Sequence, residues 1–160
     1  MRVFSEIQAF KQWWLWALLV ITLLISSIPL FSIGGSFNNI QWNLIGFIPV
    51  LLIIVMFLVL KLETRIDRNG ITAEFTPFRI FKRHYHWNEI SKCYVRKYSA
   101  ISEFGGWGVR GFGTAKAYNV SGNKGIQIVT KDDKKFLIGT NKPEEAQKVI
   151  KRYQDNKDEI

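Results

Sequence analysis

The stretch LETRIDRNGITAEF, residues 62–75, begins the β-rich part of the chain. Apolar and charged residues alternate on both sides of Asn69-Gly70. A period of two is that of a strand with one buried face, and Asn-Gly is the strongest short signal for a two-residue hairpin turn. The stretch therefore predicts a β-hairpin.

Downstream of this hairpin the same period predicts further short strands, separated by turn-forming residues. They are expected at residues 79–87, 89–99, 107–112, 116–120, 125–130 and 135–140. Seven or eight short strands at even spacing favour a barrel or a sandwich. The segment 142–154 has a helical period instead, with Pro143 at the first helical position and Glu144 and Glu145 in the first turn. We expect a small antiparallel barrel with this helix covering one open end.

Upstream of the hairpin, no residue from Gln12 to Leu60 is charged or a histidine. Two apolar runs, about 13–31 and 44–60, would measure about 28 and 26 Å as helices, close to a hydrocarbon core of about 30 Å. They predict two transmembrane helices. A buried hairpin of a soluble protein is disfavoured because neither run has a polar face. A cleaved signal peptide is disfavoured because the first run is long and no small-x-small site stands out.

The charges divide the chain into a tail with two apolar runs, residues 1–61, and a basic domain, residues 62–160. The chain carries 22 Lys and Arg against 13 Asp and Glu, and only Arg2 and Lys11 of the basic residues precede the uncharged block. The link between the two runs has no charge, so the positive-inside rule places both termini in the cytoplasm.

The glycine-rich segment EFGGWGVRGFG, residues 103–113, contains the spacing G-x-G-x-x-G. A dinucleotide loop needs a strand before these glycines and a helix after them, whereas the residues that follow here alternate like a strand. We expect the glycines to permit positive φ where a strand bends, with Trp107 packed across neighbouring backbone. As a candidate interaction surface we take Gly105, Gly106, Trp107, Gly108 and Arg110.

Other residues give weaker signals. A basic cluster is a candidate for contact with anionic lipid, or else an ordinary solvated face: Arg65, Arg68, Arg79, Lys82 and Arg83. His84 and His86 are expected to share a strand face, with Cys93 seven residues later, but no third and fourth ligand is obvious and we predict no metal site. We also predict no catalytic residues, no cofactor and no nucleic-acid partner.

Several segments together resemble a known kind of protein. RKYSAISEFGGWGVR (96–110), KAYNVSGNKGIQIVT (116–130) and KKFLIGTNKPEEA (134–146), with ETRIDRNGI (63–71) after a double apolar run, are similar to small bacterial two-span membrane proteins of unknown function that carry a pleckstrin-homology-like domain. The resemblance covers nearly the whole chain. It implies a PH-like barrel of about seven strands capped by a C-terminal helix, in the bacterial inner membrane, and it implies no activity.

The leading hypothesis is a non-enzymatic, membrane-anchored PH-like module that binds another protein, another copy of itself, or the inner leaflet. One alternative is a ligand- or nucleotide-binding protein that uses the Gly-rich segment 105–113. Another is an oligomeric channel or gating subunit built from the apolar hairpins.

Overall fold

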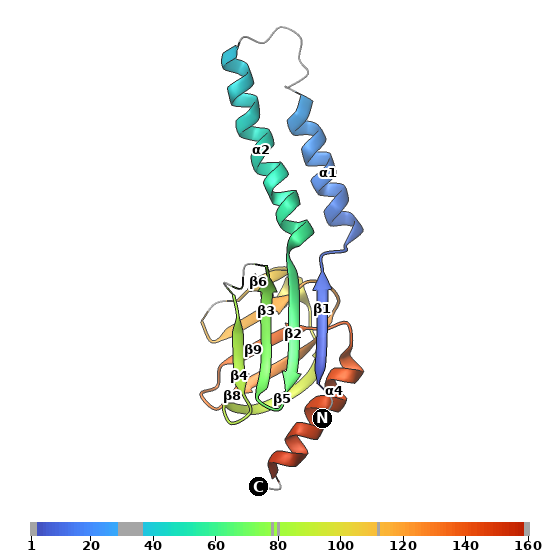
Figure 1. Cartoon of the computed structure of the whole chain (residues 1–160), viewed down its shortest axis with the longest axis vertical. Coiled ribbons are helices and arrows are strands. Elements are labelled where there is room, and N and C mark those ends of the chain that lie inside the picture. Colours follow the sequence, from blue (N-terminus) through green and yellow to red (C-terminus); the bar gives the residue numbers. More distant parts are fainter. Residues whose placement is uncertain (1–2, 29–36, 78, 80, 112, 159–160) are drawn as a thin grey trace. The chain divides into compact units, whose positions relative to one another are not determined.

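The computed structural model describes residues 3–28, 37–77, 79, 81–111 and 113–158, and in 37–43 and 156–158 only the backbone. The chain divides into two compact units (Figure 1). One is a helical unit, Phe10–Leu60, and the other is a two-sheet unit made of the residues up to Ala9 together with Lys61–Ile160. Each unit is described by itself below.

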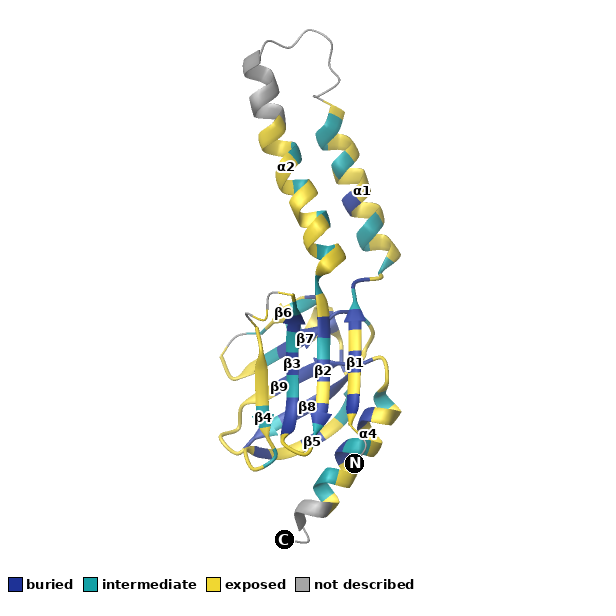
Figure 2. Cartoon of the chain, in the orientation of Figure 1, coloured by how far each residue is buried: buried dark blue, intermediate teal, exposed yellow. Residues whose placement is uncertain are grey.

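The helical unit consists of α1, Trp13–Ser27, and α2, Phe37–Val59. At its start the ring of Phe10 packs edge-to-face on Phe57 of α2, with ring centroids 5.0 Å apart. Trp16 Nε1 donates to the Phe10 carbonyl at 2.9 Å. Most described apolar side chains of both helices are exposed, as the yellow parts of the ribbon in Figure 2 show, and the large ones on α1 are Trp13, Trp14, Leu18, Val20, Ile21, Leu24 and Ile25.

The structure contradicts the prediction of two transmembrane helices. Among the described residues, no helix combines the length and the apolar character that crossing a membrane requires. α1 has 15 residues, about 22 Å of helix against a core of about 30 Å, and residues 29–31 of the first predicted span lie outside the described residues. The side chains described in α2 run from Leu44 to Val59, about 24 Å. The predictions of an integral membrane protein, a membrane partner and an inner-membrane location depended on these spans and lose their support with them.

The first sheet has four antiparallel strands in the order β1-β2-β3-β4. Their bounds are Phe4–Ala9, Lys61–Asp67, Gly70–Thr76 and Arg83–His86. The predicted hairpin is confirmed, because β2 pairs with β3 in a register that ends at Asp67 opposite Gly70. β1, which the sequence did not predict, pairs with β2 from Phe4 opposite Ile66 to Ala9 opposite Lys61.

The second sheet has five strands in the order β5-β8-β9-β7-β6. Their bounds are Ile90–Lys97 for β5, Lys124–Thr130 for β8, Lys135–Gly139 for β9, Ala115–Asn119 for β7 and Gly108–Arg110 for β6. All neighbours are antiparallel except β7 and β9, which are parallel. Two helices accompany this sheet, the short α3, Ala100–Phe104, and α4, Pro143–Asp158.

The core of the two-sheet unit lies between the sheets, and many strand residues of both sheets are buried (dark blue in Figure 2). Phe75 of β3 packs on Tyr118 of β7, with centroids 5.5 Å apart, and Tyr85 of β4 packs on Phe136 of β9 at 5.3 Å. α4 adds Ile150, which is fully buried. Full burial of one such side chain contributes about 1.5–3 kcal/mol.

The predicted closed barrel is also corrected. Within the described residues β4 pairs only with β3 and β5 pairs only with β8, so each sheet keeps two open edges and no barrel closes. Alternation along each strand was enough to predict most of the strands. It carries no information on which strand pairs with which, and barrel closure depends on that pairing.

Buried polar residues of β1 join it to the segment that enters α4. Glu6 is 5% exposed, and its carboxylate accepts from Thr140 Oγ1 at 2.6 Å and from the Asn141 N–H at 2.8 Å. Gln8 Nε2 donates to the Gly139 carbonyl at 2.7 Å. Hydrogen bonds to a charged group contribute about 1.5–3 kcal/mol each, so these contacts tie β1 to the segment between β9 and α4.

Candidate functional site

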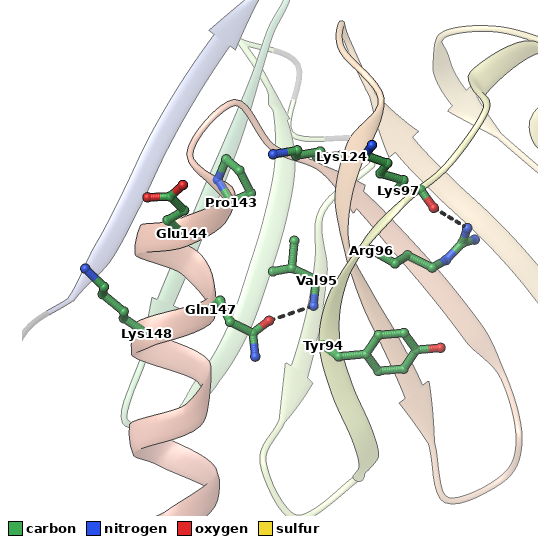
Figure 3. A pocket seen from close by; sticks show the side chains of 9 residues that line it. All are labelled: Tyr94, Val95, Arg96, Lys97, Lys124, Pro143, Glu144, Gln147 and Lys148. Carbon is green, nitrogen blue, oxygen red and sulfur yellow. Dashed lines mark hydrogen bonds between the residues drawn. The ribbon is translucent and has the colours of Figure 1, made fainter.

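An open groove of about 760 Å³, which we call the β5–α4 groove, lies between β5 and α4 (Figure 3). It is lined by Tyr94, Val95, Arg96, Lys97, Lys124, Pro143, Glu144, Gln147 and Lys148. Its walls come from an edge strand and a terminal helix, which lie side by side although far apart in the sequence. The lining contains four basic side chains and one carboxylate.

α4 forms where the sequence predicts it, and the local chemistry explains why. Pro143 starts the helix, and Glu144 and Glu145 occupy the first turn, at the positive end of the helix dipole. Ala146 and Ile150 are buried on the face turned to the sheets. The opposite flank remains free to line the groove with polar side chains.

β5 is an edge strand, and side chains of α4 bind its outer backbone groups. The Val95 N–H donates to Gln147 Oε1 at 2.9 Å, and Gln154 Nε2 donates to the Cys93 carbonyl at 3.0 Å. In an antiparallel strand the N–H and C=O of one residue point to the same side, so the Val95 carbonyl also faces away from β8. α4 therefore covers part of this edge, and an extended chain that added to β5 would have to displace the side chains of Gln147 and Gln154.

The basic residues of the groove are not equivalent. Arg96 is held in place, because its guanidinium forms two bonds to the Glu103 carboxylate, at 2.7 and 3.2 Å, and one to Gln127 Oε1 at 3.0 Å. The hydrogen bonds from Arg96 lower the pKa of Glu103. Among the described residues, Lys97, Lys124 and Lys148 have no carboxylate within ion-pair distance. They give the groove its unbalanced positive charge.

The Gly-rich segment is built differently from a phosphate-binding loop. The helix α3 precedes its glycines and the strand β6 lies among them, whereas a dinucleotide loop needs a strand before the glycines and a helix after them. The N–H groups are already used: that of Gly105 bonds the Ile101 carbonyl, that of Gly106 the Ala100 carbonyl, and that of Gly108 the buried Asn119 Oδ1 at 2.9 Å. This leaves few free amides to hold an anion.

The conformations of the segment agree with the prediction of positive φ. Gly105, Gly106, Gly108 and Gly111 all have φ between 70° and 129°. Trp107 is half-buried against the small hydrophobic cluster that includes Tyr98 and Leu137. Arg110 is exposed and bends back, so that its Nε donates to the Trp107 carbonyl at 2.7 Å. Whether this surface binds a partner remains a prediction.

The structure gathers part of the predicted basic cluster. Arg65, Arg79 and Lys82 line a polar pocket of about 570 Å³ on the outer face of the first sheet, whereas Arg68 and Arg83 are not in its lining. The same pocket is lined by three carboxylates and two further polar side chains: Glu63, Asp67, Glu74, Thr72 and His84. Arg65 Nε lies 3.2 Å from Asp67 Oδ2. The formal charges of the lining cancel, so the pocket is not a positive patch.

The two histidines and the cysteine are separated. His84 and His86 lie together on β4, as the sequence predicts, whereas Cys93 is 4% exposed on β5 in the other sheet. Burial raises the pKa of the Cys93 thiol to about 12. The thiol therefore stays protonated near neutral pH, a state that neither attacks an electrophile nor binds a metal.

Sequence reasoning missed the β5–α4 groove. Of its lining residues, only Pro143 and Glu144 had been singled out, and only as the start of a helix. The basic residues of β5 were not singled out, because nothing in the local pattern shows that β5 is an edge or that α4 lies beside it.

No protein-family model matches the chain, and no curated protein matches it. The resemblance to two-span membrane proteins with a PH-like domain is therefore corrected as well. The structure contains two open sheets in place of a closed barrel, and none of its described helices can span a membrane. The function must be inferred from the site itself.

Proposed function

We propose that the chain is a non-catalytic interaction module that binds an acidic, extended segment of a partner protein in the β5–α4 groove. The observation that carries the proposal is the edge strand β5, flanked by Lys97, Lys124 and Lys148 without carboxylate partners among the described residues. A partner strand along β5 would gain main-chain hydrogen bonds, and acidic side chains would pair with the lysines.

Gln147 supports this proposal, because its side-chain carbonyl accepts the Val95 N–H as a neighbouring strand would. A side-chain amide is easily displaced by rotation, so an incoming main-chain carbonyl can replace it on Val95. The lining residues of the groove come from both β5 and α4, so a bound segment would contact both elements (Figure 3).

The test is peptide binding measured by fluorescence polarisation. The probe is a fluorescein-labelled octapeptide of alternating Glu and Val, with the matched Lys and Val peptide as its counterpart. We expect the acidic peptide to bind and the basic one not to bind. The double variant Lys97→Glu, Lys148→Glu should weaken binding about tenfold or more, because charge reversal replaces attraction by repulsion.

The matched control is Lys151→Glu, which makes the same change on the same helix outside the groove lining. It should change affinity less than about twofold. Equal binding of the two peptides, no binding of either, or an equal loss in the Lys151 variant would overturn the proposal.

A second function, self-association through the helical unit, is favoured by a separate observation. The unit contains no charged residue from Gln12 to Leu60, and its large apolar side chains are exposed in the single chain. Apolar surface of this extent is typical of an interaction site, and a second copy offers a surface of the same character. We infer that copies of the chain associate through α1 and α2.

Analytical ultracentrifugation of the purified full chain tests this second function. The wild type should sediment as one discrete oligomer, and Leu24→Lys, which places a charge at a position that is 61% exposed, should shift the population to monomer. Leu24→Met, which conserves volume and apolarity, is the control and should leave the oligomer intact. A monomeric wild type, or an oligomer unaffected by Leu24→Lys, would refute it.

A further inference from the structure

The outer edge of the first sheet brings together the chain's only two histidines and one main-chain carbonyl. His84 Nε2 lies 3.3 Å from His86 Nδ1, with the two rings nearly perpendicular. His86 Nδ1 also lies 3.1 Å from the carbonyl oxygen of Asn69 in the β2–β3 turn. Both histidine side chains are exposed, so a solute can reach these three atoms.

The spacing of these atoms fits a tetrahedral metal ion. With metal–nitrogen bonds of about 2.0–2.1 Å, two ligands at a tetrahedral angle lie about 3.3 Å apart, whereas two adjacent square-planar ligands lie about 2.9 Å apart. The 3.3 Å between the two histidine nitrogens matches the first value, whereas the 3.1 Å from His86 Nδ1 to the Asn69 carbonyl oxygen lies midway between the two. Imidazole nitrogen with tetrahedral geometry is the preference of Zn²⁺.

Hydrogen bonding prepares His84 for this role. The Asn69 carbonyl oxygen can only accept a hydrogen bond, so the proton of neutral His86 lies on Nδ1. His84 Nε2 faces this N–H and therefore carries the lone pair. The proton of His84 is then on Nδ1, which donates to Thr72 Oγ1 at 2.7 Å. An outer hydrogen bond that fixes the tautomer and the ring orientation is the usual support of a metal-binding histidine.

Two carboxylates bond the backbone beside the proposed ligands. Asp67 Oδ1 accepts the Asn69 N–H at 2.9 Å, and Glu89 Oε2 accepts the His86 N–H at 3.1 Å. Each of these carboxylates thus bonds the backbone of a residue that supplies a proposed ligand. His84 also borders the polar pocket on the outer face of the first sheet. In the lining of that pocket, three basic side chains are balanced by three carboxylates.

We propose that His84 Nε2, His86 Nδ1 and the Asn69 carbonyl oxygen bind Zn²⁺, with water completing the tetrahedron. Within the described residues no three His, Cys, Asp or Glu side chains are grouped to hold a metal, so this site has two side-chain ligands and one main-chain ligand. On binding, the proton of His86 moves from Nδ1 to Nε2 through solvent.

The site is tested on the full chain labelled with ¹⁵N and titrated with ZnCl₂ at about pH 7.5, where imidazole is mostly neutral. With two histidines in the chain, four imidazole nitrogens report directly on the site. We expect His84 Nε2 and His86 Nδ1 to shift as metal-bound nitrogens, and the proton of His86 to appear on Nε2. No shift of these nitrogens at millimolar Zn²⁺ would overturn the proposal.

Calorimetric titration with ZnCl₂ measures the contribution of each residue. His84→Ala and His86→Ala should each weaken binding at least tenfold. Thr72→Val, which removes the hydroxyl that holds His84, should weaken it about tenfold, and Thr72→Ser should restore it. Cys93→Ala should bind as the wild type does. Wild-type affinity in either histidine variant, or loss of binding in Cys93→Ala, would refute the assignment.

Discussion

Replacing Phe136 by Ala is expected to lower the free energy of unfolding by about 3–5 kcal/mol, because a buried aromatic side chain is lost and a cavity remains. Phe136 is 2% exposed, and its ring contacts Tyr85 of the first sheet and Tyr118 of the second, with centroids 5.3 and 4.8 Å away. Removing it therefore weakens the packing that joins the two sheets. Urea unfolding followed by tryptophan fluorescence measures the change.

The control for this prediction is Phe81→Ala, since Phe81 is 45% exposed. This variant loses the same side chain from the surface and should change stability by less than about 1 kcal/mol. A loss in Phe136→Ala no larger than in Phe81→Ala would show that the two sheets do not share one core.

Gly111→Ala is expected to destabilise the protein by about 2–4 kcal/mol, for two additive reasons. Gly111 has φ +92°, which a residue with a side chain rarely adopts. A Cβ there would also lie 2.2 Å from the Ala115 carbonyl oxygen and 2.8 Å from Lys116 Cα. Both are backbone atoms of the segment that begins β7, so no side-chain rotation can relieve the clash. Thermal unfolding followed by circular dichroism measures the loss.

Gly113→Ala separates the two causes. Gly113 also has positive φ, +61°, but nothing lies within 4 Å of an added Cβ. This variant should lose only the conformational part, about 1–2 kcal/mol. Equal losses at the two positions would show that close approach of the backbone plays no part, and would reopen the segment to interpretation as a flexible binding loop.

The sequence predicted those elements whose local pattern and tertiary environment agree. The hairpin around Asn69-Gly70 and the helix from Pro143 are such cases, since turn chemistry, capping and apolar period all favour the same structure. The side-by-side placement of His84 and His86 followed from strand geometry alone.

β1 was missed because its pattern is inverted. Its buried face carries Glu6 and Gln8, while Ile7 is 63% exposed. Alternation of apolar and polar residues therefore indicates the wrong face, and only the partners of Glu6 at Thr140 and Asn141 explain why a carboxylate is buried there. The partners lie more than 130 positions away, beyond the reach of any local pattern.

The candidate site was missed for a related reason. Lys97 and Lys148 lie 51 positions apart, and nothing in either segment shows that they border one groove. Their proximity follows from β5 being an edge and from α4 packing beside it. Edge position depends on the pairing order of the whole sheet, which also decides whether a barrel closes.

The path of the chain through the first sheet makes the helical unit an insertion between two adjacent strands. The chain leaves the sheet after Ala9 and re-enters it at Lys61, and these two residues are register partners on adjacent strands. The first sheet therefore holds both ends of the inserted segment side by side, whatever the length of that segment. Since the entropic penalty of closing a flexible loop grows by only about 0.6 kcal/mol for each doubling of its length, inserts of very different size suit the same junction. The inserted segment can therefore change in length and sequence while the two strands that flank it stay the same.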